Sequence, residues 1–162
     1  MKKWALFAMF IGLAVLGSMI KIPVFLGSIA LDSLPAIVAA VVFGILFGGA
    51  VGIFGHLLSA LTAGFPLGMF HLLVAVEMGL LVWLFGSVYK KGAKTLAAIL
   101  FLIGNSVVAP FPFYFILGAS FYKAVVPALM LGAGINVIVA YLLIPRLSTL
   151  MSPTSRKREV KG

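Results

Sequence analysis

The chain has 162 residues, of which 64% are apolar and only 9% are charged, whereas ordinary soluble domains are about 45–50% apolar and about 25% charged. A soluble domain of this size could not bury so much apolar surface, so a soluble enzyme, a nucleic-acid-binding domain and a disordered tail are all poor interpretations. The formal net charge is +9 and there is no cysteine, which removes disulfides, thiolate metal sites and cysteine nucleophiles. The composition therefore predicts an integral membrane protein.

The first two apolar runs predict three membrane helices. The first run covers residues 4–20, a suitable length for one span. The second run covers 35–62, and its 28 residues would extend about 42 Å at about 1.5 Å per residue, too long for one untilted span. We therefore expect two short helices, 35–47 and 49–62, with a tight turn at Gly48-Gly49 between them.

Three further runs complete the predicted bundle. The third covers 66–88 and the fourth 93–108, where two prolines stop the helix because proline lacks an amide donor and clashes in a helix interior. The last covers 121–144 and is closed by Pro145. The predicted fold class is an all-α integral membrane protein with six transmembrane helices.

The basic residues predict the orientation of this bundle. Of the twelve Lys and Arg residues, ten lie on the side of the two termini and two, Lys21 and Lys123, on the other side. Cytoplasmic loops carry an excess of Lys and Arg, so both termini are expected in the cytoplasm. A five-helix version with 35–62 as one span would move Lys2 and Lys3 outside, and the charge distribution therefore favours six helices.

The two ends of the chain need separate interpretations. Two lysines followed by an apolar run resemble a secretory signal peptide, but the run is slightly long and no clear A-x-A site follows, so we expect it to be retained. We divide the chain into a six-helix transmembrane domain, 1–147, and a basic cytoplasmic tail, 148–162. The tail is either a hydrated end or a segment attracted to anionic lipids of the inner leaflet.

A few polar side chains interrupt the apolar helices. In lipid an ionisable side chain costs about 2.5–3.5 kcal/mol on insertion scales, so each one is a functional hypothesis by default. All the candidates map to the outer half of the predicted bundle, and we expect them to line an outward-facing pocket. These candidates are Asp32, His56, His71, Glu77 and Asn105.

Three of these residues also have a structural interpretation. Asp32 precedes a helix that begins with Pro35, where it or the next serine is an ordinary N-cap. His56 lies on a glycine-rich face and is equally suited to an inter-helix hydrogen bond, and Glu77 to a neutral acid in a helix interface. Asn136 lies too deep for the pocket, and we interpret it as a polar link between helices.

Aromatic side chains crowd the outer end between the last two predicted helices. Most such residues form an interfacial belt, but some can stack on a planar ligand, and Tyr114 is taken as a candidate contact. No P-loop, H-E-x-x-H, G-x-S-x-G or known zinc spacing is present, so we predict no enzyme, no cofactor and no metal. Any ATPase that drives transport must be another chain. On the first helix Ala5, Ala8 and Gly12 form a small-residue face suited to close contact with a partner helix or within the bundle.

Together these features resemble the substrate-binding S components of energy-coupling factor (ECF) vitamin transporters. The resemblance covers nearly all of 3–147. It is carried by the small-residue first helix, by Lys21-Ile22-Pro23, by Leu31-Asp32-Ser33-Leu34-Pro35 and by the glycine-rich stretch 43–52. It implies six helices, cytoplasmic termini, a pocket that opens outward, and the loop 21–31 as its lid.

The resemblance also implies partners and a mechanism. An S component assembles with a transmembrane T protein and two cytoplasmic ATPases, and the whole subunit topples in the membrane to carry its ligand inward. Relatives contact the T protein through an A-x-x-x-A motif on the first helix, which reads Ala8-x-x-x-Gly12 here. The expected location is the bacterial plasma membrane.

The substrate is less closely defined. The stretch 55–68 is similar to a subgroup linked to salvage of cobamide precursors, chiefly α-ribazole, while pantothenate, hydroxymethylpyrimidine, riboflavin and a queuosine precursor stay open. No cation lies at mid-depth, which argues against a strongly anionic ligand. Two other functions also stay open: a stand-alone transporter that couples to protons through Glu77, and a structural membrane protein with no small ligand.

Overall fold

The computed structural model describes residues 2–20, 22–24, 27–29 and 31–150. Its helices are α1 (Lys2–Met19), α2 (Leu34–Val42), α3 (Ile45–Thr62), α4 (Phe70–Lys90), α5 (Lys94–Ile103), a π-helical turn (Gly104–Val108), α6 (Phe111–Ile116) and α7 (Ala119–Leu150). A short antiparallel hairpin, β1 (Ile22–Val24) and β2 (Gly27–Ile29), lies between α1 and α2. The hairpin is the one departure from the predicted all-α fold within the described residues.

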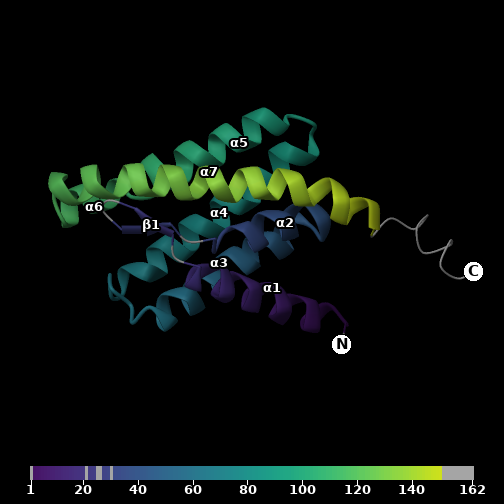
Figure 1. Ribbon diagram of the computed structural model, residues 1–162, viewed down its shortest axis with the longest axis horizontal. Helices are drawn as coiled ribbons and strands as arrows, with labels where there is room; N and C mark the ends of the chain where they lie inside the picture. Colours follow the sequence, from purple (N-terminus) through teal and green to yellow (C-terminus); the bar gives the residue numbers. More distant parts are fainter. Residues whose placement is uncertain (1, 21, 25–26, 30, 151–162) are drawn as a thin grey trace, which may run out of the picture.

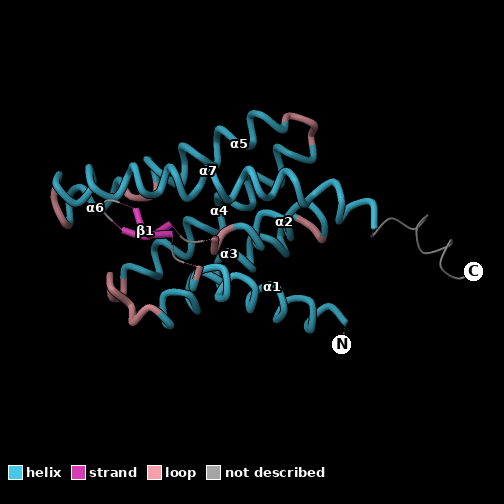
Figure 2. Tube along the Cα trace, viewed as in Figure 1, coloured by secondary structure: helices cyan, strands magenta, loops and turns pink. Residues whose placement is uncertain are grey.

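The helices form an elongated bundle with two distinct ends. The two termini and the connection between α4 and α5 lie at one end, which we call the terminal end (Figure 1). The hairpin and α6 lie at the opposite end, which we call the hairpin end (Figure 2). Within the described residues the chain therefore begins, in α1, and finishes, in α7, at the same end of the bundle.

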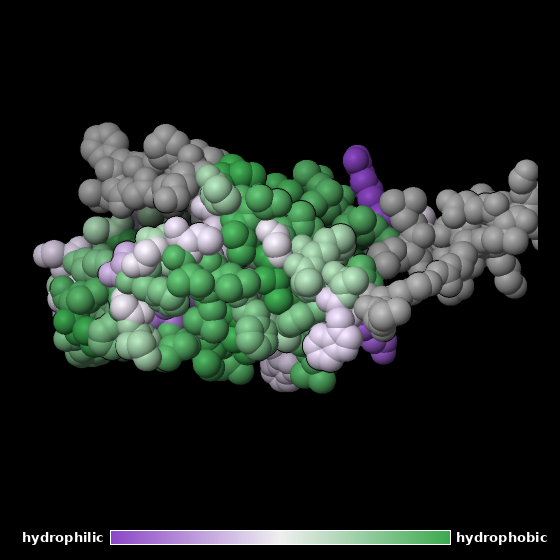
Figure 3. All heavy atoms as spheres, turned by 90° about the horizontal axis from the view of Figure 1, so that it is seen from below, coloured by the Kyte–Doolittle hydropathy of each residue, from purple (hydrophilic) through white to green (hydrophobic). Residues whose placement is uncertain are grey.

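The outer surface has the character of a membrane protein. Four helical segments are long and apolar enough to cross a membrane, namely Ile45–Thr62, Phe70–Lys90, Lys94–Ile116 and Ala119–Thr149, and α1 is a shorter apolar helix. Large apolar side chains such as Leu46 and Phe115 are more than 70% exposed, and one face of the molecule is apolar over most of its area (Figure 3). The prediction of a multi-pass helical membrane protein is confirmed in this form.

The turn between the second and third helices was placed wrongly. The structure breaks the run at Gly44, whose φ of +128° is a conformation that residues with a Cβ avoid. Gly48 and Gly49 instead lie inside α3, and a Cβ added to Gly48 would clash with the backbone of Ala40 on α2. These glycines allow close helix contact, which the sequence pattern does not distinguish from a turn.

The predicted end of the last helix was also wrong. Pro145 lies inside α7, which continues to Leu150, and Pro127 lies inside it as well. Proline at 145 removes one backbone donor without ending the helix, and Thr149 Oγ1 donates to the Pro145 carbonyl oxygen over 2.9 Å in the turn that follows. Pro110 does end the preceding helical segment, because it occupies the N-cap of α6.

The apolar core fills the bundle toward the terminal end. It packs α2 among the surrounding helices, and its fully buried members include Ile37, Val82, Phe85 and Phe101. Asn136 on α7 is buried beside this core, and its Oδ1 accepts a hydrogen bond from the Leu34 N–H over 2.8 Å. The predicted role of Asn136 as a polar link between helices is confirmed.

Candidate ligand-binding cavity

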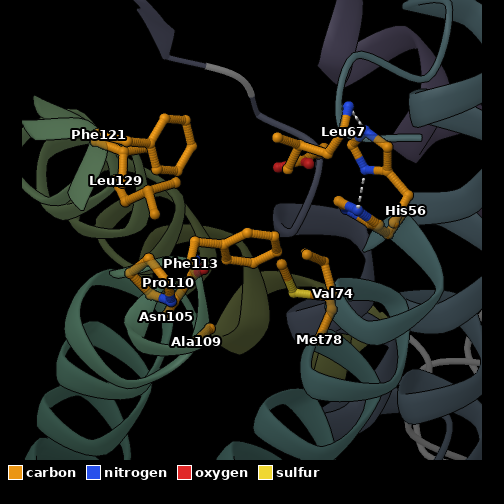
Figure 4. Close-up of a pocket in the computed structure, with 13 residues that line it drawn as sticks. His56, Leu67, Val74, Met78, Asn105, Ala109, Pro110, Phe113, Phe121 and Leu129 are labelled. Carbon is orange, nitrogen blue, oxygen red and sulfur yellow. Dashed lines mark hydrogen bonds between the residues drawn. The ribbon is translucent and has the colours of Figure 1, made fainter. Parts of the chain in front are cut away.

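A cavity of about 190 Å³ lies near the hairpin end of the bundle. It is enclosed by the segment before α2, by α3 and the connection that follows it, and by α4, the π-helical turn, α6 and α7 (Figure 4). The lining residues are Asp32, His56, Leu67, His71, Val74, Met78, Asn105, Ala109, Pro110, Phe113, Phe121, Val125 and Leu129. Four of the six predicted ligand contacts therefore converge on one cavity.

Two histidines form one wall of the cavity. His56 on α3 and His71 on α4 are joined by a hydrogen bond between His56 Nε2 and His71 Nδ1, 3.2 Å long (Figure 4). The Leu67 N–H donates to His71 Nε2 over 3.3 Å, so the connection between α3 and α4 is fixed to the same pair. His56 thus forms the inter-helix hydrogen bond that was one of its two interpretations, and it also lines the cavity.

Asp32 lies at the edge of the cavity, directly before α2. Burial raises the pKa of its carboxyl from the ordinary 3.8 to about 6, partly offset by backbone hydrogen bonds at Ser33 and Asp32. Ser33 occupies the N-cap position, but no side-chain capping bond is formed there. The Leu34 N–H bonds to Asn136 instead, so capping does not account for the carboxylate at this position.

The opposite wall is aromatic and carries one amide. Phe113 on α6 is buried and packs edge-on against Phe70 and at a tilt against Phe121, with ring centroids 5.8 Å and 6.2 Å apart. Asn105 lies in the π-helical turn and lines the cavity below these rings (Figure 4). Its amide offers a ligand both hydrogen-bond donors and an acceptor.

The other two predicted contacts, Glu77 and Tyr114, do not line this cavity. Glu77 precedes Met78 on α4, and its Oε2 is buried without a hydrogen-bond partner among the described residues. Tyr114 is 41% exposed and stacks on Phe111, with centroids 6.3 Å apart and an interplanar angle of 14°. Its surroundings match the interfacial belt that the sequence analysis weighed against a ligand role.

The apolar residues that line the cavity were not among the predicted ligand contacts. On α4 it consists of Val74 and Met78, three and seven residues after His71, and on α7 of Val125 and Leu129, four and eight after Phe121. This is the spacing of one helix face. A search for residues that share a face with each polar candidate would have found them.

The small-residue face of α1 points away from the bundle. Ala5, Ala8 and Gly12 are all exposed, and a Cβ added to Gly12 would meet no atom within 4 Å. Phe10 and Ala14 on the same helix are buried in the bundle instead. Packing within this protein therefore does not account for the three small residues.

Comparison with known proteins identifies the family of the chain and a solved structure with a similar fold. The family model "ECF transporter, substrate-specific component" matches residues 2–152. The fold is similar to the solved structure of the S component of a bacterial ECF transporter, with a TM-score of 0.70 and 20% identity over 93% of this chain and 98% of that one. No match was found among curated proteins. Because the family match spans nearly the whole chain, this protein belongs to the substrate-specific components of ECF transporters, membrane subunits that bind small molecules, associate with T and ATPase modules, and are not enzymes.

Proposed function

We propose that this chain captures a vitamin or vitamin precursor outside the bacterial plasma membrane and delivers it inward with a T protein and two ATPases. One observation carries the proposal: Asp32, His56, His71 and Asn105, from four separate elements, line a single cavity. Polar groups placed in a membrane-embedded bundle are costly unless they serve a function. Binding a polar nutrient is that function here.

Charge supports an outward-facing cavity. Lys90, Lys91 and Lys94 lie around the connection between α4 and α5, at the terminal end (Figure 1). By the positive-inside rule this end faces the cytoplasm, and the cavity at the hairpin end then opens to the outside. In this topology the chain also passes between the two ends through α1 and back through α2 together with the segment before it, which gives six passes.

The ligand that fits best is a small ring compound, with α-ribazole or a related cobamide precursor as the first candidate. Phe113 and Phe121 offer stacking surfaces, while Asp32 and Asn105 offer hydrogen-bonding groups in the same lining. Glu77 and Tyr114 are left out of the proposed contacts because they do not line the cavity. The lid predicted over 21–31 lies partly outside the described residues.

Delivery depends on a docking surface on α1. The exposed face of Ala5, Ala8 and Gly12 allows close approach of a partner helix, and we propose that the T protein occupies it while the subunit topples. A proton-coupled transporter built on Glu77 is less well supported, because that carboxyl does not line the cavity and the family works with separate ATPases.

The test is to identify what the purified protein carries. Mass spectrometry after mild denaturation should find one vitamin or precursor, and His56→Ala should lose it, while Ser87→Ala, at the exposed terminal end of α4, should keep it. Proteoliposomes should import that molecule only when the T protein and ATPases are present. Uptake driven by a proton gradient through this chain alone would contradict the proposal.

A further inference from the structure

Two hydrogen bonds, from Leu67 to His71 and between His71 and His56, determine which ring nitrogens of the two histidines carry protons. A backbone N–H can only donate, so His71 Nε2, 3.3 Å from the Leu67 nitrogen, accepts and carries no proton. Neutral His71 then holds its proton on Nδ1 and donates it to His56 Nε2 over 3.2 Å. His56 must therefore hold its own proton on Nδ1, a buried atom without a hydrogen-bond partner among the described residues.

This arrangement also keeps both rings uncharged. A second proton on His71 would occupy the nitrogen that accepts from Leu67, and a second proton on His56 would face the N–H of His71. Neither ring can become a cation while the two bonds are in place. The histidine wall therefore offers neutral dipoles and no positive charge.

Within the part of the chain that the structure describes, no group lining the cavity supplies a positive charge. Among the lining residues that the structure describes, none is Lys or Arg, and the one carboxylate is Asp32. Lys123 on α7 is exposed and is not part of the lining. An anionic ligand would thus meet a carboxylate and neutral groups, and none of the described lining residues could pair its charge.

The cavity also limits the size and shape of the ligand. An engineered apolar cavity of about 150 Å³ holds one benzene ring, so a cavity of about 190 Å³ encloses one substituted ring or the fused bicycle of a larger ligand. Phe113 and Phe121 lie on one side and Val74 and Met78 on the other (Figure 4), which favours a flat ring.

We infer that the cavity selects an uncharged or cationic planar ring that carries a hydrogen-bond donor for Asp32, and that it rejects an anionic counterpart of the same size. The inference rests on the proposed function and specifies the chemical class of its substrate. His71 is a positioning residue in this scheme, because it holds His56 neutral and in one tautomer.

The first test measures ligand preference directly. The full-length protein in nanodiscs of uncharged lipid is dialysed against vitamins and precursors that include matched pairs: nicotinamide with nicotinate, hydroxymethylpyrimidine with its phosphate, and α-ribazole with its 5′-phosphate. Pantothenate and biotin are added as anionic vitamins, and retained compounds are quantified by mass spectrometry. We expect the uncharged member of the retained pair to exceed the anionic member by at least ~10-fold.

The outcomes separate the two proposals. Retention of an anion equal to or above that of its neutral counterpart overturns the inference and leaves vitamin capture standing, whereas retention of nothing refutes vitamin capture and the inference with it. Lys21 lies outside the described residues, so Lys21→Ala is measured in parallel, and we expect it to show the same preference.

The second test examines the histidines by spectroscopy. In protein labelled with ¹⁵N-histidine, the His56 resonances at pH 7 should show a neutral ring protonated on Nδ1. In a folded His71→Ala variant this signature should give way to exchange between tautomers, an effect that a merely structural role for His71 does not produce. A doubly protonated His56, or one protonated on Nε2 in the unaltered protein, would rule out the scheme.

Discussion

Replacing Asp32 by Asn should stabilise the ligand-free protein at neutral pH and weaken ligand binding at the same time. Burial raises the pKa of the Asp32 carboxyl from 3.8 to about 6 in the folded protein. The folded state therefore holds this proton more tightly than the unfolded state, and stability falls as pH rises from about 4 through about 6. Above that range the cost is about 3 kcal/mol, and an uncharged Asn does not incur it.

The assay is thermal or denaturant unfolding of both proteins in the same detergent at several pH values. At pH 7.5 the Asn variant should be more stable by up to about 3 kcal/mol, and near pH 4 the gain should fall below about 1 kcal/mol. Affinity for the ligand should fall at least ~10-fold in the variant, because the amide is a weaker acceptor than the carboxylate. Equal or lower stability of the variant at pH 7.5 would refute the argument that burial of this charge is costly.

Three further substitutions test packing, docking and the polar link. Gly48→Ala should destabilise the protein by about 1–3 kcal/mol, because its Cβ would clash with Ala40. The control Gly12→Ala should not destabilise it, because the added Cβ meets nothing within 4 Å. Equal unfolding temperatures for the two variants would argue against tight contact between α2 and α3. Gly12→Trp should leave ligand binding by the isolated chain intact and reduce reconstituted uptake at least ~10-fold. Leu80→Trp, on the exposed face of α4, serves as its control. Unchanged uptake by the Gly12→Trp variant would exclude α1 as the docking surface. Asn136→Leu should cost about 1–3 kcal/mol in unfolding experiments because it leaves the buried Leu34 N–H without its acceptor, and no loss would show that this bond is dispensable.

The sequence predicted which end of the bundle carries the polar groups, because depth follows from counting residues along each helix. Asp32, His56, His71 and Asn105 do line one cavity. The direction in which a side chain points around the helix axis does not follow from such a count, and one polar residue alone gives no information on it. For this reason Glu77 was given the correct depth but was also assigned to a pocket that it does not line.

The errors in helix boundaries have a related cause. Glycine serves both as a turn residue and as a site of close packing, so the stretch 44–55 offers several equivalent breaks, and only the structure distinguishes Gly44 with its positive φ from Gly48 against Ala40. Proline in turn lowers helix stability locally, but α7 continues through Pro145. Local preference was a reliable guide where two prolines stand close together, because Pro110 and Pro112 occupy the N-cap and first turn of a new helix, α6.

The position of the core relative to the cavity bears on how a ligand crosses the membrane. On α4 the cavity is lined by residues up to Met78, and the buried Val82 and Phe85 follow toward the terminal end. The rings of Phe85 and Phe101 meet edge-on with centroids 6.0 Å apart and belong to the packed core. A path through the bundle would require this core to open, at a cost of several buried apolar side chains of about 1.5–3 kcal/mol each. Movement of the whole subunit leaves the core intact, and for this reason we favour toppling over passage through the chain.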